Sequence, residues 1–292
     1  MRKICVIELL SAKNVRSFSS IRNEEATIRS SSFSGEPVNF TESIIWFTSS
    51  MTCRSAFGQV LKEQDKFIKL IGEVIRLAGG FDVADIFPSY KFLHSLSKTK
   101  KKLLDVHCQC IRQTQEEVPE AFRDNATFNV EELNYLKLVV KETLRLHPPV
   151  PLLTLRECME ETDLNDYTIP LKTKVMVNVR VIGRDPKYLY DAESFKPERF
   201  EQCSVDFNGN NFEYLPFGNG RRICPGISFD LANVYLPLAQ LLYHFDWKLP
   251  IGMEPSDLDL TESAGVTSSL KNVLGSICVL NGKWRNQVEE KN

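Results

Sequence analysis

Long apolar stretches are missing from this sequence of 292 residues, and its first residues are charged. Because a membrane-spanning helix needs roughly 18 or more consecutive apolar residues, the sequence predicts neither a transmembrane anchor nor a signal peptide. An excess of one charge is missing too, since 36 Lys and Arg residues face 38 Asp and Glu residues. This balance gives no argument for nucleic-acid binding. Repeats and low-complexity segments are also missing, so the 42% of hydrophobic residues predict a globular core of one large domain or two small ones.

A repeated pairing of cysteines is missing as well. The eight cysteines lie at scattered positions, which predicts reduced thiols in a protein that faces the cytosol. The stretch from His107 to Cys110 has the residue types of half a zinc site, but no matching second pair exists, so we do not favour a metal site there. His94, His147 and His244 are better interpreted as packing or helix-end residues than as general bases.

The most specific pattern in the sequence is the loop from Phe217 to Gly226, which contains one cysteine and three glycines. Gly218 and Gly220 give this loop conformational freedom and leave room for a flat group close to the backbone. A helical pattern begins at Ile227, so Cys224 is expected at a helix N-terminus, where the helix dipole lowers the thiol pKa and stabilises a thiolate. The alternative is a structural buried cysteine beside a tight turn.

This loop resembles the haem-binding loop of the cytochrome P-450 family, with its pattern F-x-x-G-x-R-x-C-x-G. The resemblance implies that Cys224 is the axial thiolate on haem iron. It also implies that Arg222 reaches an anionic substituent at the haem edge, that Phe217 shields the sulfur from water, and that the three glycines, Gly218, Gly220 and Gly226, let the backbone approach the cofactor.

A second motif lies in the segment that ends at His147-Pro148-Pro149. Apolar residues recur there at helical spacing, Asn129 is a plausible N-cap, and the two prolines are expected to stop the helix. Glu142 and Arg145 share one face of this helix and resemble the E-x-x-R signature of the same family. Arg199 lies in a segment that resembles the family's P-E-R-F block. The resemblance implies a structural network of Glu142, Arg145 and Arg199 that holds the cysteine loop in place.

Short strands are predicted between these motifs, at residues 151–156, 167–170 and 173–179. They resemble the small sheet of the family, in which Arg156 matches a residue that pairs with a haem propionate. Arg2 similarly matches the arginine of the family's W-x-x-x-R motif. This chain departs from relatives at Leu155, where proline is usual, and at Val179-Arg180, where plant members usually carry Ala-Trp.

One family motif is missing: the A/G-G-x-D/E-T sequence of the oxygen-activating helix, whose acid and threonine relay protons at the haem site. Residues 78–82 lack the threonine and lie in the wrong block. The sequence that ends near His107 resembles the start of one family helix. From Gln113 onward, the sequence resembles a segment that, in the family, lies beyond the oxygen-activating helix. We therefore expect that the central helices are skipped, that the amino-terminal anchor and first sheet are absent, and that residues 272–292 form an atypical tail.

The expected fold is mainly α with a small mixed β-sheet, as one partial cytochrome P-450 domain over residues 1–292. Its parts are N-terminal helices (1–107), then the E-x-x-R helix, small sheet and haem-binding loop (113–271), and the tail (272–292). The apolar stretches at 78–87, 150–153 and 264–266 are expected to contribute to the substrate pocket.

The resemblance is closest to plant microsomal enzymes that hydroxylate terpenoids or alkaloids. It implies a haem b cofactor (iron protoporphyrin IX), a hydrophobic small-molecule substrate, O2, an NADPH-cytochrome reductase as partner, no nucleic acid, and peripheral contact with the cytosolic face of the endoplasmic reticulum membrane. Two alternatives stay open: a non-catalytic truncated fragment that binds haem poorly or not at all, and an unrelated helical protein with a structural cysteine loop.

Overall fold

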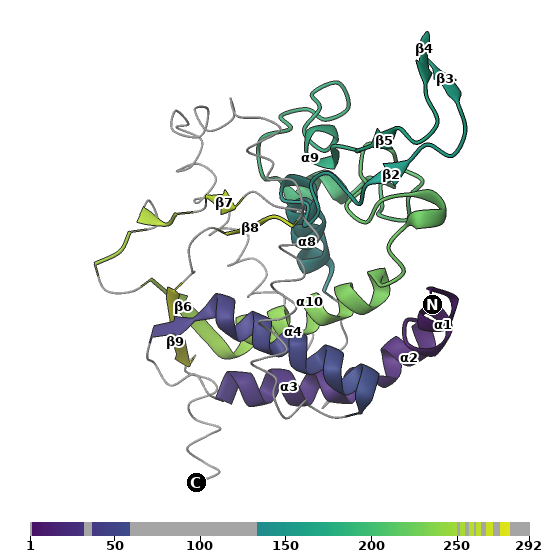
Figure 1. Cartoon of the computed structure of the whole chain (residues 1–292). Helices are drawn as coiled ribbons and strands as arrows, with labels where there is room; N and C mark the ends of the chain where they lie inside the picture. Colours follow the sequence, from purple (N-terminus) through teal and green to yellow (C-terminus); the bar gives the residue numbers. More distant parts are fainter. Residues whose placement is uncertain are drawn as a thin grey trace.

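The computed structural model describes residues 2–31, 37–58, 133–249, 252–254, 257–259, 261–263, 267–270 and 275–280. The helices are α1 (Arg2–Glu8), α2 (Ala12–Ser17), α3 (Ser19–Ser31), α4 (Phe40–Phe57), α8 (Asn134–Leu146), α9 (Val179–Ile182) and α10 (Ile227–His244), with 3-10 turns η3 (Pro197–Phe200) and η4 (Gly220–Arg222). The strands are β1 (Pro37–Asn39), β2 (Arg156–Glu157), β3 (Thr162–Leu164), β4 (Tyr167–Ile169), β5 (Lys174–Val175), β6 (Phe245–Lys248), β7 (Glu262–Ser263), β8 (Ser269–Leu270) and β9 (Gly275–Leu280). The fold is thus mainly helical with small sheets, as the sequence predicts (Figure 1).

The N-terminal helices pack against the helix that follows the cysteine loop. Helix α3 contacts both α4 and α10 (Figure 1). Ala26 of α3 forms a buried apolar cluster with Phe47 and Met51 of α4. Gln240 of α10 donates a hydrogen bond to Asn23 of α3 at 3.1 Å. These contacts bring the N-terminal residues close to the C-terminal half of the chain.

Helices α8 and α10 share the main apolar core of the described residues. Leu136 and Val140 of α8 pack with Leu231, Tyr235 and Ala239 of α10. The spacing of these side chains places one per turn on the facing side of each helix. The core therefore fixes the helix that carries the E-x-x-R motif relative to the helix that begins after the cysteine loop.

The two ends of α8 differ in how well the sequence predicted them. The helix ends at Leu146, immediately before His147 and Pro148, as expected. The predicted N-cap at Asn129 is wrong, because the helix begins at Asn134 after the non-helical Leu133, whose φ is −86° and ψ is 74°. The side chain of Leu133 is fully buried, so core packing rather than side-chain capping decides the start of the helix.

The predicted strands are shorter than the sequence suggested. The stretch at 151–156 is extended only at β2, because Leu153 has a positive φ of 53° that interrupts an extended backbone. The stretch at 173–179 is a strand only at β5. Strand β4 lies where it was predicted, and it pairs with the unpredicted β3 across Asn165 and Asp166. Both of these residues have positive φ, as a two-residue hairpin of this type requires.

The sheets also differ from the prediction in direction and membership. The β-pairs within the described ranges are all antiparallel, so the predicted mixed sheet is not observed there. Strand β9, which lies in the predicted atypical tail, is the central strand of a sheet between β1 and β6. The tail therefore joins a strand near residue 38 to the strand that follows α10.

Candidate functional site

The cysteine loop is closed by its own backbone. The amide of Cys224 donates to the carbonyl oxygen of Phe217 at 2.9 Å, and the amide of Ile223 donates to Gly220 at 3.0 Å. Gly218 and Gly220 have φ values of 74° and 68°, which side-chain-bearing residues rarely adopt. The structure thus places Cys224 on a tight turn held by the glycines that the sequence singled out.

Cys224 lies just before α10, whose N-cap is Gly226. Its sulfur is half-buried, accepts a hydrogen bond from the Gly226 amide at 3.4 Å and lies 4.0 Å from Asp230 Oδ2. Burial raises the pKa of the Cys224 thiol, and the charge of Asp230 acts in the same direction, while the Gly226 hydrogen bond and the charge of Arg2 act to lower it. The expectation of a lowered pKa is therefore wrong, because desolvation of the sulfur outweighs the amide at the start of the helix.

Two of the predicted arginines contact the cysteine loop from other segments, and the third, Arg222, lies within the loop. Arg2 of α1 donates to the carbonyl oxygen of Ile223. Arg156 of β2 donates to the carbonyl oxygen of Asn219 at 3.2 Å. Arg222 is exposed in η4. Two positive side chains from distant parts of the sequence therefore lie on the same short loop as Cys224.

The Arg156 guanidinium has spare hydrogen-bonding capacity. Its Nε is buried and has no hydrogen-bond partner among the residues that the structure describes. A Cβ added to Gly218 would lie 3.9 Å from Arg156 Nη2 and 3.6 Å from Leu153 Cδ1. An unpaired buried donor is costly in a folded protein. The position is therefore suited to an additional acceptor, such as a carboxylate.

Phe217 packs away from open solvent. Its ring lies 5.6 Å from that of Phe207, at an interplanar angle of 81°. Both rings pack against the α8–α10 core. This contact anchors the start of the cysteine loop to the core, and shielding of the Cys224 sulfur by Phe217 stays a prediction.

The structure brings Glu142, Arg145 and Arg199 together. Arg145 donates from Nε and Nη2 to the two oxygens of Glu142, at 2.7 and 2.8 Å, and Arg199 Nε donates to Glu142 Oε1 at 3.0 Å. Glu142 is 0% exposed and Arg145 is 2% exposed. Arg145 also donates from Nη1 to the carbonyl oxygens of Gly183 and Ala192, at 2.6 and 2.7 Å. The paired charges are thereby almost fully hydrogen-bonded, as burial requires.

This network connects to the cysteine loop through aromatic side chains. Phe200, at the end of η3, packs on Tyr214 with ring centroids 5.4 Å apart. The hydroxyl of Tyr214 donates to the carbonyl oxygen of Lys141 on α8 at 3.0 Å. Burial raises the pKa of Tyr214 well above its ordinary value, which keeps this hydroxyl a donor. Tyr214 lies three residues before Phe217, so the network supports the loop at its entry.

A second polar cluster was missed by sequence reasoning. Glu262 of β7 contacts His147, Arg180 and Ser268, which lie on three different segments. The sequence gives no signal for it, because 115 residues separate His147 from Glu262. His147 does lie at a helix end, as expected. His244 is half-buried, and this burial lowers its pKa to about 4.

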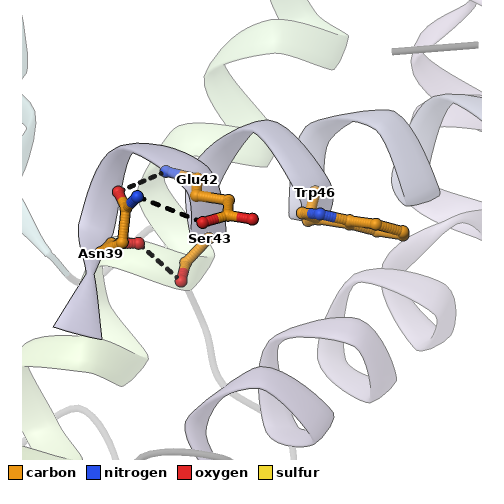
Figure 2. Close-up of a pocket in the computed structure, with 4 residues that line it drawn as sticks. All are labelled: Asn39, Glu42, Ser43 and Trp46. Carbon is orange, nitrogen blue, oxygen red and sulfur yellow. Dashed lines mark hydrogen bonds between the residues drawn. The ribbon is translucent and has the colours of Figure 1, made fainter. Parts of the chain in front are cut away.

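An open recess of about 390 Å³ lies at the start of α4, away from these groups. Figure 2 shows that Glu42 and Ser43 each form hydrogen bonds with Asn39 there, while Trp46 lies one turn further along. Asn39 Oδ1 accepts from the Glu42 amide at 3.0 Å, and Ser43 Oγ donates to the Asn39 carbonyl at 3.0 Å. The polar groups of the recess thus serve as a helix cap.

Several predicted features lie outside the described residues: the apolar loop at 78–87, the stretch at 264–266, His94, and the His107–Cys110 stretch. The same holds for the predicted junction between His107 and Gln113. Among the helices that the structure describes, none has both the length and the apolar character needed to cross a membrane.

Comparison with known proteins decides the family. The cytochrome P450 family model matches residues 103–275, and Cytochrome P450 71D7 from Solanum chacoense is 56% identical over 94% of this chain and 73% of its own length. The chain belongs to the cytochrome P450 family. This P450 is also 55% identical to 5-epiaristolochene 1,3-dihydroxylase from Nicotiana tabacum and to premnaspirodiene oxygenase from Hyoscyamus muticus, in each case over 94% of this chain and 72% of the relative. An unrelated helical protein with a structural cysteine is thereby excluded.

The general kind of enzyme follows from two of these relatives, which are named as a dihydroxylase and an oxygenase. This P450 is a monooxygenase by its similarity to them. The alignment with the Solanum chacoense relative is 365 positions long, although this P450 has only 292 residues. That relative therefore has residues, within the aligned region, that have no counterpart here.

Proposed function

We propose that this P450 binds haem b through the thiolate of Cys224 and inserts one oxygen atom from O2 into a hydrophobic small molecule. The observation that carries the proposal is the placement of the sulfur. Cys224 sits on a backbone-closed turn between two positive-φ glycines and the start of α10. Such a turn presents a sulfur with little side-chain bulk around it.

The side chains around the loop fit a porphyrin with carboxylate substituents. Arg156 has a buried, unpartnered Nε, and Arg2 contributes a second positive charge at the loop. We assign both arginines, with Arg222, to the haem propionates, because guanidinium groups bind carboxylates through paired hydrogen bonds. Phe217, Gly218, Gly220 and Gly226 complete the proposed cofactor-binding residues.

When bound, haem supplies the iron chemistry that activates O2 with two electrons delivered through an NADPH-dependent reductase. The residues of this chain hold and shape the site. The Gly226 amide donates to the Cys224 sulfur and stabilises its ionised form. The network of Glu142, Arg145 and Arg199 is proposed to act structurally, by fixing the entry to the loop.

The substrate is proposed to be a terpenoid or a similar specialised metabolite. Two relatives are named for oxidation of 5-epiaristolochene and of premnaspirodiene. The segment from Val150 to Leu153 is apolar and lies beside Gly218 at Leu153. We propose it as one wall of the substrate pocket, together with residues 78–87 and 264–266. The NADPH-cytochrome reductase is the proposed partner, and the cytosolic face of the endoplasmic reticulum membrane is the proposed location.

The proposed domain organisation is one partial P450 domain over residues 1–292. Its parts are the N-terminal helices (1–107), the E-x-x-R helix with the small sheet and haem-binding loop (113–271), and the tail (272–292).

A second candidate function is a non-catalytic fragment that binds haem poorly or not at all. It is supported by the missing A/G-G-x-D/E-T motif and by the relative's residues that have no counterpart here. In that case the thiolate loop forms without the helix that supplies protons at the haem site.

A carbon monoxide difference spectrum of the reduced, purified 292-residue protein separates the two candidates. A Soret band characteristic of thiolate-ligated haem supports the monooxygenase, and a protein without haem supports the fragment. Cys224→Ser should abolish the band, whereas Cys203→Ser should leave it, because Cys203 is exposed outside the loop. A band that survives in Cys224→Ser contradicts the ligand assignment. If haem is retained, we expect product formation to be poorly coupled to NADPH consumption.

A further inference from the structure

Glu262 is held by side chains from three separate segments. His147 Nδ1, at the end of α8, lies 2.5 Å from Glu262 Oε1. Arg180 of α9 and Ser268 donate to Oε2, with Ser268 Oγ at 2.9 Å. Burial acts to raise the pKa of Glu262, but the contacts with His147, Arg180 and Ser268 outweigh it and hold the pKa at about 2. Glu262 is thus an ionised carboxylate, and both of its oxygens have hydrogen-bond partners.

These contacts fix both arms of the β7–β8 hairpin. Glu262 lies on β7, and Ser268 immediately precedes β8. Ser268 bonds Glu262 through its hydroxyl, and its amide donates to the carbonyl oxygen of Pro149 at 2.8 Å. The hairpin is therefore docked on the residues that follow α8.

The same residues are held from a second side by α9. The carbonyl oxygen of Pro151 accepts from the amides of Val179 and Arg180, at 2.9 and 3.4 Å. Arg180 consequently contacts Glu262 with its side chain and Pro151 with its backbone. Two segments, β7–β8 and α9, thus clamp the stretch from Pro149 to Pro151.

Leu153, at the far end of this stretch, reaches the cysteine loop. Its Cδ1 lies 3.6 Å from the point that a Cβ on Gly218 would occupy. Its φ of 53° is in the left-handed region, which a leucine rarely adopts. Such a conformation persists only where surrounding contacts impose it. The Leu153 amide donates to the carbonyl oxygen of Val150 at 3.0 Å, and the clamp holds Pro149 and Pro151 on either side of Val150.

We propose that Glu262 and Arg180 are positioning residues that hold the Pro149–Leu153 segment against the cysteine loop and thereby select which hydrophobic molecules fit beside it. The selection of substrates rests on the function proposed above. Loss of the Glu262 charge leaves Arg180 and His147 without their shared partner. The hairpin is then released from Pro149, and Leu153 relaxes out of its left-handed conformation and away from Gly218.

Hydrogen exchange of the purified 292-residue chain tests the positioning, with or without haem. In Glu262→Gln and in Arg180→Gln, the amides of Ser268 and Val179 should exchange at least tenfold faster than in the unaltered protein. Glu262→Asp should restore part of the protection. Glu193→Gln is the matched control, because the Glu193 side chain is 69% exposed where it pairs with Arg184. Unchanged protection of both amides in Glu262→Gln overturns the proposal.

Substrate binding tests the selection. With a terpenoid hydrocarbon as probe, the dissociation constant should rise about tenfold in Glu262→Gln, while the haem content stays that of Glu193→Gln. An unchanged dissociation constant together with faster exchange overturns the selection but supports the positioning. A protein with no thiolate-haem band overturns the selection together with the proposed function, and the exchange result still decides the positioning.

Discussion

Arg199 Nε donates a hydrogen bond to Glu142 Oε1 at 3.0 Å, although 57 residues separate the two in the sequence. The same oxygen accepts from the Lys196 amide at 2.7 Å, and Arg145 occupies both carboxylate oxygens from within α8. The carboxylate is completely buried. A buried charge is tolerated only with such complete pairing, so each partner depends on the others.

Removal of the Glu142 charge should destabilise the fold strongly. In Glu142→Gln, the buried Arg145 guanidinium keeps its charge but loses its counter-ion, which we expect to cost about 3–5 kcal/mol of unfolding free energy. Urea unfolding followed by circular dichroism measures this loss. The control Glu193→Gln removes a mostly exposed partner of Arg184 and should cost less than about 1 kcal/mol. Equal losses in the two variants would contradict a role for burial.

Should Glu142→Gln fail to fold, Arg199→Lys provides a milder change in the same network. Lysine cannot reproduce the several directed hydrogen bonds that Arg199 makes to Glu142 and to the carbonyl oxygens of Tyr190, Asp191 and Ser194. We expect a loss of about 1–3 kcal/mol in the same assay.

Gly183 should resist substitution for a steric reason. A Cβ at this position would lie 2.9 Å from the carbonyl oxygen of Arg145 and 3.3 Å from that of Val179. Both are backbone atoms that cannot move independently, so Gly183→Ala should cost about 2–3 kcal/mol in thermal or urea unfolding. Gly58→Ala is the comparison, because its Cβ would meet nothing within 4 Å and only its positive φ is strained. A loss of about 1 kcal/mol is expected there, and a larger loss at Gly58 than at Gly183 would refute the steric argument.

The contribution of Glu262 to stability should depend on pH in the acid range. Its pKa is about 2 in the fold, compared with an ordinary value of 4.5. A carboxyl with a depressed folded-state pKa stabilises the fold above its unfolded pKa and loses this contribution as the pH falls through the folded value. The stability difference between the unaltered protein and Glu262→Gln should therefore be about 1–2 kcal/mol near neutral pH, after allowance for solvent screening. It should shrink progressively below about pH 4.5 in urea titrations, and a difference that is constant with pH would contradict the assignment.

The reactivity of Cys224 in haem-free protein should respond to Asp230. Burial and the nearby Asp230 carboxylate both raise the pKa of the Cys224 thiol. Asp230→Asn removes the second cause, so alkylation by iodoacetamide near pH 8 should become faster, by roughly two- to fivefold. Mass spectrometry of the modified peptide measures the rate. Asp257→Asn is the control, because Asp257 is exposed on a separate turn, and it should leave the rate unchanged.

The family and the main motifs could be predicted from the sequence because they depend on local rules. Positive φ at Gly218 and Gly220 requires glycine, and Pro148 ends α8 because it cannot continue a helix. The spacing of Glu142 and Arg145 alone places them on one helix face. The central position of β9 could not be predicted in this way, because strand pairing joins residues far apart in sequence.

Tertiary structure alone decided the electrostatics and the second cluster. The position of Cys224 just before a helix suggested a lowered thiol pKa. Burial of the sulfur, which the sequence does not specify, raises this pKa instead. The sequence does not indicate that Arg180 and Glu262 are partners, and only folding places them together with His147. Short motifs fix which groups are present and how the nearby backbone turns. Desolvation and long-range contacts, which fix the properties of those groups, arise only when distant segments pack together.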